Sequence, residues 1–215
     1  MEARPKILIA YDGSEGADIA ISDLKLAGLS HRMDAIVITV GELSLSFPPS
    51  YGMVETDFAE RHSTNLKEAQ ALVSKGCECL RALFPTWEIS PEASIGSAAG
   101  EILTKADSWK PDLILLGSHG RSRLSRMMFG SIAQQVVTEA HCSVRIGRKS
   151  TQEESHPARI IIGLDGSACA SAAVDIVAMR QWPKGSVVKL ITSTNSEEIE
   201  ELAHAQKFRS RQRLS

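Results

Sequence analysis

Glycines and a serine with a distinctive spacing lie near the middle of the chain, in the stretch GSHGRSRLSRMMFGS. Gly117 and Gly120 open this stretch, and Gly130 and Ser131 close it, directly before a pattern that predicts a helix. Glycine allows backbone amides to approach a ligand without interference from a Cβ atom, and the first turn of a helix has free N–H groups. Because these groups bind anions, the spacing predicts a phosphate-binding loop.

A plainer interpretation of the same glycines is that they form turns and caps around a polar connection. The stretch is not a P-loop, because no Gly-Lys-Ser/Thr follows the glycines, and it is not a G-x-G-x-x-G motif. Two observations favour a ligand. The loop follows the apolar run LILL, which predicts an inner strand, and Asp12 ends another predicted strand beside the same crevice. Taken alone, Asp12 is typical of a simple Asp-Gly turn.

The elements expected to position these residues are short apolar runs that alternate with longer amphipathic ones. Strands are predicted at residues 6–12, 34–40, 86–94, 112–117 and 143–147, and helices at 14–30, 56–83, 97–108 and 131–140. Near-continuous apolar strands joined by helical crossovers indicate a parallel sheet covered on both faces. The sequence therefore predicts a doubly wound α/β domain with a five-stranded parallel sheet, in which ligands bind beyond the carboxyl ends of the strands.

The first strand and turn recur near the end of the chain. The segment ILIAYDGS at 7–14 corresponds to IIIGLDGS at 160–167, and the register is kept through the following helix and strand. Such self-similarity indicates an internal repeat. We therefore expect a complete module at 1–148, a polar linker at 149–157 and a truncated second module at 158–215, which has no counterpart of the glycine loop.

The composition excludes several classes of protein. Hydrophobic residues make up 43% of the 215 residues, which excludes wholesale disorder. A net charge of −2 argues against bulk binding of nucleic acid or of anionic membranes. The four cysteines fit neither a zinc site nor a disulfide framework, and no apolar run approaches the roughly 18 residues of a membrane span. We expect a cytoplasmic protein with reduced thiols.

The pattern G-x-x-G, nine residues, then G-S resembles the nucleotide-binding signature of the universal stress protein family. The start ILIAYDGSEGA resembles the first strand and turn of that family, and GSIAQQVVTEAHCSVRIGR resembles its closing helix and strand. The similarity covers residues 6–148 as one module and 158–195 as the opening of a second. It implies a Rossmann-like five-stranded sheet, ATP in one branch of the family, and dimer-type pairing through the last strand.

The resemblance also implies roles for individual residues. Asp12 would lie at the adenine and ribose end, and the backbone of Val40 would meet the adenine edge. The residues implied at the phosphate end are Gly117 and Gly120 in the first turn of the loop, and Gly130, Ser131 and the amide of Ile132 at the phosphates. Mg²⁺ or Mn²⁺ would bridge phosphate oxygens, because the sequence shows no dedicated carboxylate cage.

The chain departs from the family pattern in two places. Arg145 lies inside the last strand, SVRIG, which is usually more apolar, and this leaves open whether Arg145 faces a partner, a ligand or solvent. The second module stops before any glycine loop, so we do not expect it to bind nucleotide in the same way.

These features predict an ATP-binding sensor or regulator in a stress response, working as a homo-oligomer or through pairing of its own modules. Efficient catalysis is not indicated, since the sequence shows no Ser-His-Asp set, paired carboxylates or Walker lysine, although slow hydrolysis remains open. One alternative is an interaction module that binds no nucleotide and works through paired sheets. Another is an enzyme such as an adenylyl transferase, which would need a further histidine or lysine motif.

Overall fold

A computed structural model of the chain describes residues 4–41, 55–118, 130–149 and 156–193. The chain divides into two compact units, 1–154 and 155–215. Each unit is described by itself below. No helix in the described ranges is both long enough and apolar enough to cross a membrane.

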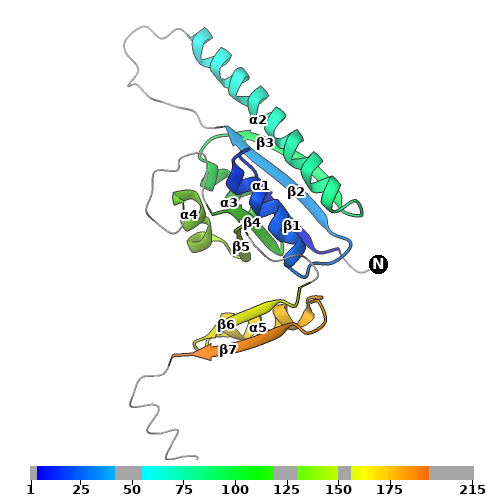
Figure 1. Cartoon of the computed structure of the whole chain (residues 1–215). Coiled ribbons are helices and arrows are strands. Elements are labelled where there is room, and N and C mark those ends of the chain that lie inside the picture. The colour runs from blue at the N-terminus through cyan, green and yellow to red at the C-terminus, as the bar shows by residue number, and fades with distance from the viewer. Residues whose placement is uncertain (1–3, 42–54, 119–129, 150–155, 194–215) are drawn as a thin grey trace, which may run out of the picture. The chain divides into compact units, whose positions relative to one another are not determined.

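The first unit is a five-stranded parallel sheet with the strand order β3-β2-β1-β4-β5 (Figure 1). The strands are β1 (Lys6–Ala10), β2 (Asp34–Gly41), β3 (Glu88–Ile95), β4 (Leu113–Gly117) and β5 (Ser143–Gly147). The helices are α1 (Glu15–Asp23), a 3₁₀ turn at Leu24–Leu26, α2 (Glu55–Leu83), α3 (Ala98–Trp109) and α4 (Ser131–Glu139). The prediction of a doubly wound, five-stranded parallel α/β sheet is confirmed.

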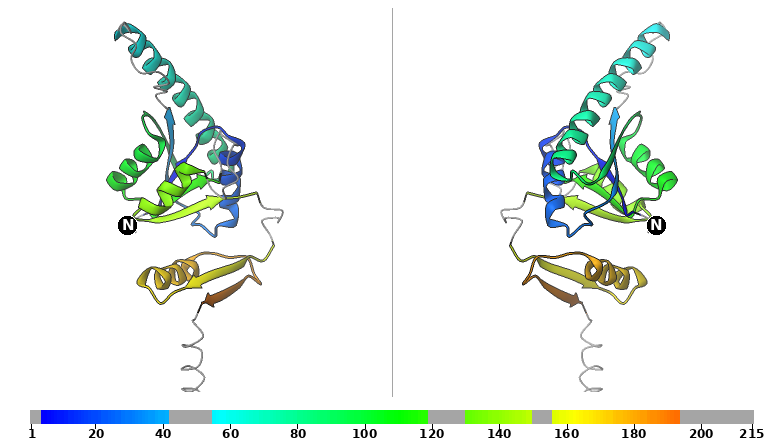
Figure 2. Two further views of the ribbon diagram at one scale, coloured as in Figure 1. Left: turned by 90° about the vertical axis from the view of Figure 1, so that its left-hand side faces the viewer. Right: turned by 90° about the vertical axis from the view of Figure 1, so that its right-hand side faces the viewer.

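Helices cover both faces of the sheet of the first unit (Figure 2), and the core has one layer on each face. Ile7 and Ile9 of β1 pack with residues of α1 and α2, whereas Leu8 packs with residues of α3 and α4. All three side chains are completely buried. Because successive residues of a strand point to opposite faces, a continuous apolar run supplies both layers at once, which is why these strands are not amphipathic.

Helix α1 comes within backbone contact of the carboxyl ends of β4 and β5. Gly117 and Gly147, which we call the glycine pair, are register partners there. A Cβ atom added to Gly117 would lie 2.9 Å from the backbone of Gly16, and one added to Gly147 would lie 2.4 Å from Cα of Ala20. Backbone atoms cannot rotate away from such a clash, so the glycine pair allows α1 to lie this close to the sheet.

The second unit contains β6 (Arg159–Leu164), α5 (Ala168–Met179) and β7 (Val187–Thr192). β6 and β7 pair in parallel. Gly166, between β6 and α5, has a φ of +80°, close to the +76° of Gly13 between β1 and α1. The serine that follows each glycine caps its helix: Ser14 accepts from the N–H of Ala17 and Ser167 from that of Ala170. That this unit is a truncated second module stays a prediction.

Candidate functional site

The strand order reverses between β1 and β4, and the predicted site residues follow these two strands. Ile9 and Leu115 are register partners, so Tyr11 lies level with Gly117 where the strands end. Asp12 therefore leaves the sheet beside the glycine that precedes the loop. Open α/β sheets bind ligands at such a point, which we call the switch point.

Asp12 holds the turn that leads from β1 into α1. Its Oδ1 accepts a hydrogen bond from the N–H of Ser14 (3.0 Å), while Gly13 adopts a φ of +76°. The hydroxyl of Ser14 then accepts from the N–H of Ala17 (3.2 Å), which caps α1. One carboxylate oxygen of Asp12 is thus committed to the turn, and the half-buried side chain is fixed next to the switch point.

The backbone of Val40 is directed toward the switch point. The carbonyl of Ile38 accepts from the N–H of Tyr11 on the β1 side of β2 (2.9 Å). The carbonyl of Gly41 instead accepts from the N–H of Gly96, on the β3 side (3.0 Å). Because alternate residues of a strand direct their backbone groups to opposite neighbours, the N–H and C=O of Val40 face the β1 side. They do so at the level where the chain has already turned from β1 into α1.

The two ends of the glycine loop are joined by a hydrogen bond. The N–H of Gly130 donates to the carbonyl of Ser118 (3.1 Å), which places the start of α4 beside the end of β4. Gly130 is the N-cap of α4 and, having no side chain, makes no side-chain cap hydrogen bond. Ser131 and Ile132 follow in the first turn of the helix, and both are exposed. The first-turn N–H groups of a helix carry partial positive charge, so this terminus can accept an anion.

Six of the seven predicted binding residues fall within the described ranges, at or beyond the carboxyl ends of the strands. They are Asp12, Val40, Gly117, Gly130, Ser131 and Ile132. The seventh, Gly120, lies outside the described residues. Gly117 has a role that the sequence did not reveal, because the close approach of α1 leaves no room for a Cβ atom at this position.

Tyr11 directly precedes Asp12 at the switch point and was not singled out from the sequence. Its hydroxyl donates to Oδ1 of Asp18 (2.7 Å), and its carbonyl accepts from the buried hydroxyl of Thr39 (2.7 Å). Burial raises the pKa of Tyr11, and the hydrogen bond to Asp18 raises this pKa further. Lys75 of α2 lies 6.0 Å from the ring centroid. The only available signal was an aromatic residue between an apolar run and Asp-Gly.

The ligand groups visible here are backbone amides, a carboxylate and a hydroxyl. Within the described ranges, no group of three or more His, Cys, Asp or Glu side chains could hold a metal ion. The arginines and His119 of the loop lie outside those ranges. The arrangement can therefore bind an anion and a hydrogen-bonding edge, and no catalytic residue is assigned.

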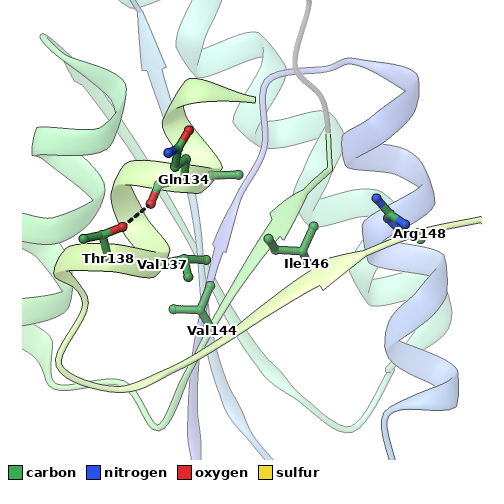
Figure 3. Close-up of a pocket in the computed structure, with 7 residues that line it drawn as sticks. Gln134, Val137, Thr138, Val144, Ile146 and Arg148 are labelled. Carbon is green, nitrogen blue, oxygen red and sulfur yellow. Dashed lines mark hydrogen bonds between the residues drawn. The ribbon is translucent and has the colours of Figure 1, made fainter. Parts of the chain in front are cut away.

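A second surface feature is an open groove of about 520 Å³ between α4 and the outer strand β5 (Figure 3). Its lining residues are Ala133, Gln134, Val137, Thr138, Val144, Ile146 and Arg148. Val137 is half exposed, although it is apolar. An exposed apolar strip beside an edge strand is typical of a surface that binds another protein.

Arg145 does not face this groove. Its Nε and Nη2 atoms lie 2.8 and 2.7 Å from Oδ2 of Asp23, at the end of α1. Val144 and Ile146, its neighbours in β5, line the groove on the other face of the sheet. The sequence left open whether Arg145 faces a partner, a ligand or solvent, and the structure shows that it binds α1 of its own chain.

A family model described as the universal stress protein family matches residues 4–148. A universal stress protein of Methanocaldococcus jannaschii is 32% identical over 152 residues, which cover 69% of this chain and 84% of that protein.

Two solved structures show the same fold. Universal stress protein UspA from Lactobacillus plantarum has a TM-score of 0.57 at 23% identity and covers 68% of this chain and 100% of its own. A universal stress protein from Archaeoglobus fulgidus has a TM-score of 0.67 at 17% identity, and the match covers 96% of this chain and 74% of that one.

Proposed function

Because the chain belongs to the universal stress protein family, we propose that its first unit binds ATP at the switch point and acts as a nucleotide-dependent sensor or regulator in a stress response. The observation that carries this proposal is the hydrogen bond between Gly130 and Ser118. It holds the uncapped start of α4 beside the end of β4, where a phosphate group would be expected in this type of sheet.

The adenine and ribose would lie at the ends of β1 and β2. A backbone edge such as that of Val40 pairs with a base through N–H and C=O groups, which adenine complements at its own edge. Asp12 would accept hydrogen bonds from ribose hydroxyls. Both groups are fixed before any ligand arrives, so little ordering entropy is lost on binding.

The phosphates would lie at the start of α4. The proposal assigns them to the glycine loop (Gly117, Gly120, Gly130), to Ser131 and to the amide of Ile132. Mg²⁺ or Mn²⁺ would bridge phosphate oxygens, as is usual for these hard cations. Any turnover of ATP would be slow, since no group is assigned as a base or nucleophile.

We propose that the first unit also pairs with a second copy through β5 and the groove beside it. Arg145 is compatible with this pairing because it faces α1 and leaves the groove side of β5 apolar. Pairing of the two units within one chain is the alternative. The free state of all four cysteines fits a protein of the reducing cytoplasm.

The exposed groove also favours a second candidate, an interaction module that has no nucleotide. Acid extraction of the freshly purified chain, followed by equilibrium dialysis against Mg-ATP, separates the two. Retained adenylate together with a raised Tm supports the first candidate, because a ligand at a hundredfold excess over Kd stabilises by about 2.7 kcal/mol. If millimolar ATP gives neither retained adenylate nor a raised Tm, the second candidate, the interaction module, is supported.

Pairing is tested by sedimentation of Val137→Lys against Thr104→Lys, an exposed position on α3. Only the first variant adds a charge to the groove, so only it should shift the chain toward monomers. Equal sedimentation of both variants and the unchanged chain would exclude the groove.

A further inference from the structure

Among the described residues of the second unit, one edge of β6 pairs with no other strand. Within the described residues, β6 pairs only with β7. β1, which carries the same sequence pattern, is flanked by both β2 and β4. An isolated two-stranded sheet is marginally stable in water, and an unpaired edge is a template for another strand.

Helix α5 also leaves much of this two-stranded sheet uncovered. Ile162 is buried on the face that α5 covers, whereas its neighbour Ile161 is 66% exposed. Four further large apolar side chains of β7 are about half exposed: Val187, Val188, Leu190 and Ile191. Figure 2 shows α5 on one side of the two strands. A surface of this kind is expected to be buried in a larger assembly.

The backbone of β6 shows which residues are available at the free edge. The carbonyl of Ala158 accepts from the N–H of Val187, so Ala158 faces β7. Alternate residues face opposite edges, and the backbone groups of Arg159, Ile161 and Gly163 therefore face outward. An incoming strand would bind to these three residues.

We propose that two copies of the chain associate through β6, with the two β6 strands antiparallel and centred on Ile162. In this register Ile161 of each copy lies opposite Gly163 of the other, and Arg159 lies opposite Asp165. Ile161 and Gly163, which both face outward, exchange backbone hydrogen bonds in this register, while Arg159 meets the side chain of Asp165 just beyond the end of β6. The result is a continuous four-stranded sheet built from two second units.

The register follows from hydrogen bonding and charge together. Only registers that place an outward-facing residue opposite another one allow the exchange of hydrogen bonds. Among these, centring on Ile162 places the positive Arg159 opposite the negative Asp165, and the twofold symmetry makes this pair twice. Centring on Ile161 would place Arg159 opposite Gly163 and leave both charges without this partner. Opposite charges on directly facing residues stabilise strand pairs, and this self-complementarity favours a second copy as the occupant.

This association is independent of nucleotide binding and of pairing through β5, so it goes beyond the proposed function. It also explains how an open two-strand unit can be ordered. Gly163 suits the centre of the contact because it has no side chain and the space beside it is open, since a Cβ atom added there would meet nothing within 4 Å.

Disulfide mapping tests the register in the full chain, with Cys169 replaced by Ser in every variant. An Ile161→Cys chain is mixed with a Gly163→Cys chain and oxidised, and the linked peptides are identified by mass spectrometry. Facing residues of an antiparallel pair lie about 5.5 Å apart between Cα atoms, within disulfide range. We expect a link between positions 161 and 163. The matched control is Val187→Cys with Gly163→Cys. Val187 is likewise accessible to oxidation but belongs to β7, away from the proposed contact, so this pair should give no link.

Charge variants provide a second measurement that does not depend on cysteine. Arg159→Gln and Asp165→Asn should each weaken self-association by about tenfold in sedimentation on dilution. Asparagine keeps an oxygen that can accept from the N–H of Ser167, the bond that Asp165 makes at 2.9 Å, so the turn is preserved. A link that forms equally in the control, or unchanged self-association of both charge variants, would overturn the proposal.

Discussion

Arg145 and Asp23 join the outer strand of the first unit to the end of α1. Nε and Nη2 of Arg145 both lie within hydrogen-bond distance of Oδ2 of Asp23, at 2.8 and 2.7 Å, and the Asp23 side chain is only 12% exposed. This contact lies beyond the glycine pair along α1. It therefore clamps the end of the helix whose start rests on Gly117.

Removing the arginine should destabilise the first unit through this clamp. Arg145→Met leaves the carboxylate of Asp23 largely buried without its cation, and we expect the free energy of unfolding to fall by about 2 kcal/mol. Urea denaturation measures this change. The control is Glu88→Gln, because the ion pair of Glu88 with Arg4 is exposed and should contribute less than about 0.5 kcal/mol. Equal losses of unfolding free energy in the two variants would show that the contact between Arg145 and Asp23 stabilises the unit no more than an exposed ion pair does.

The same substitution should have opposite effects at two glycines. Gly147→Ala forces a methyl group against the backbone of Ala20 and should lower the free energy of unfolding by about 1–3 kcal/mol. Gly100→Ala, inside α3, meets its nearest atoms at 3.6 Å and should raise this free energy by about 1 kcal/mol. Thermal and urea unfolding of both variants test the pair. A stabilised Gly147→Ala would contradict the close approach of α1.

The sequence predicted the strands well, because a run such as ILIA or LILLG must be buried on both faces. It predicted one helix over 14–30, whereas α1 ends at Asp23 and a 3₁₀ turn follows. The contact between Arg145 and Asp23 could not be predicted, because the two residues are 122 positions apart and no local pattern links them. For the same reason, the sequence could assign Gly117 to the loop but not to its contact with α1.

Binding of phosphate at the start of α4 can be tested with two changes at one residue. Ser131→Ala removes the hydroxyl, whereas Ser131→Pro also removes the backbone N–H. Proline is favoured at the first helical position, and Gly130 has the extended conformation that precedes proline well (φ −66°, ψ 156°). We expect the alanine variant to bind ATP somewhat more weakly and the proline variant at least about tenfold more weakly, with Tm in the absence of ATP unchanged or higher.

Dialysis with Mg-ATP measures both affinities of the Ser131 variants, and thermal melts without ATP confirm that α4 is intact. If the proline variant retained the full affinity of the unchanged chain, the first-turn amide would have no role in binding.

The buried hydroxyl of Tyr11 should make the first unit sensitive to alkali. The unfolded chain loses this proton near the ordinary pKa of 10.0, whereas the folded chain keeps it to higher pH. The stability that Tyr11 contributes is thus present in full below pH 10 and falls above it, by about 1.4 kcal/mol per pH unit.

Tyr11→Phe should cost about 1 kcal/mol at neutral pH, because the hydrogen bond to Asp18 is lost, and this deficit should shrink above pH 10. Urea titrations of both chains from neutral to alkaline pH measure the difference. A deficit that stays constant with pH would contradict the proposed burial.

In both units, the glycine of the Asp-Gly-Ser connection has nearly the same φ, and the connection makes the same hydrogen bonds, although the surrounding residues differ. Its geometry is therefore encoded by three consecutive residues and needs no neighbour. Such a connector can form the same turn in different surroundings. Its occurrence in a sequence is therefore evidence for a strand-to-helix turn before it is evidence for a bound cofactor.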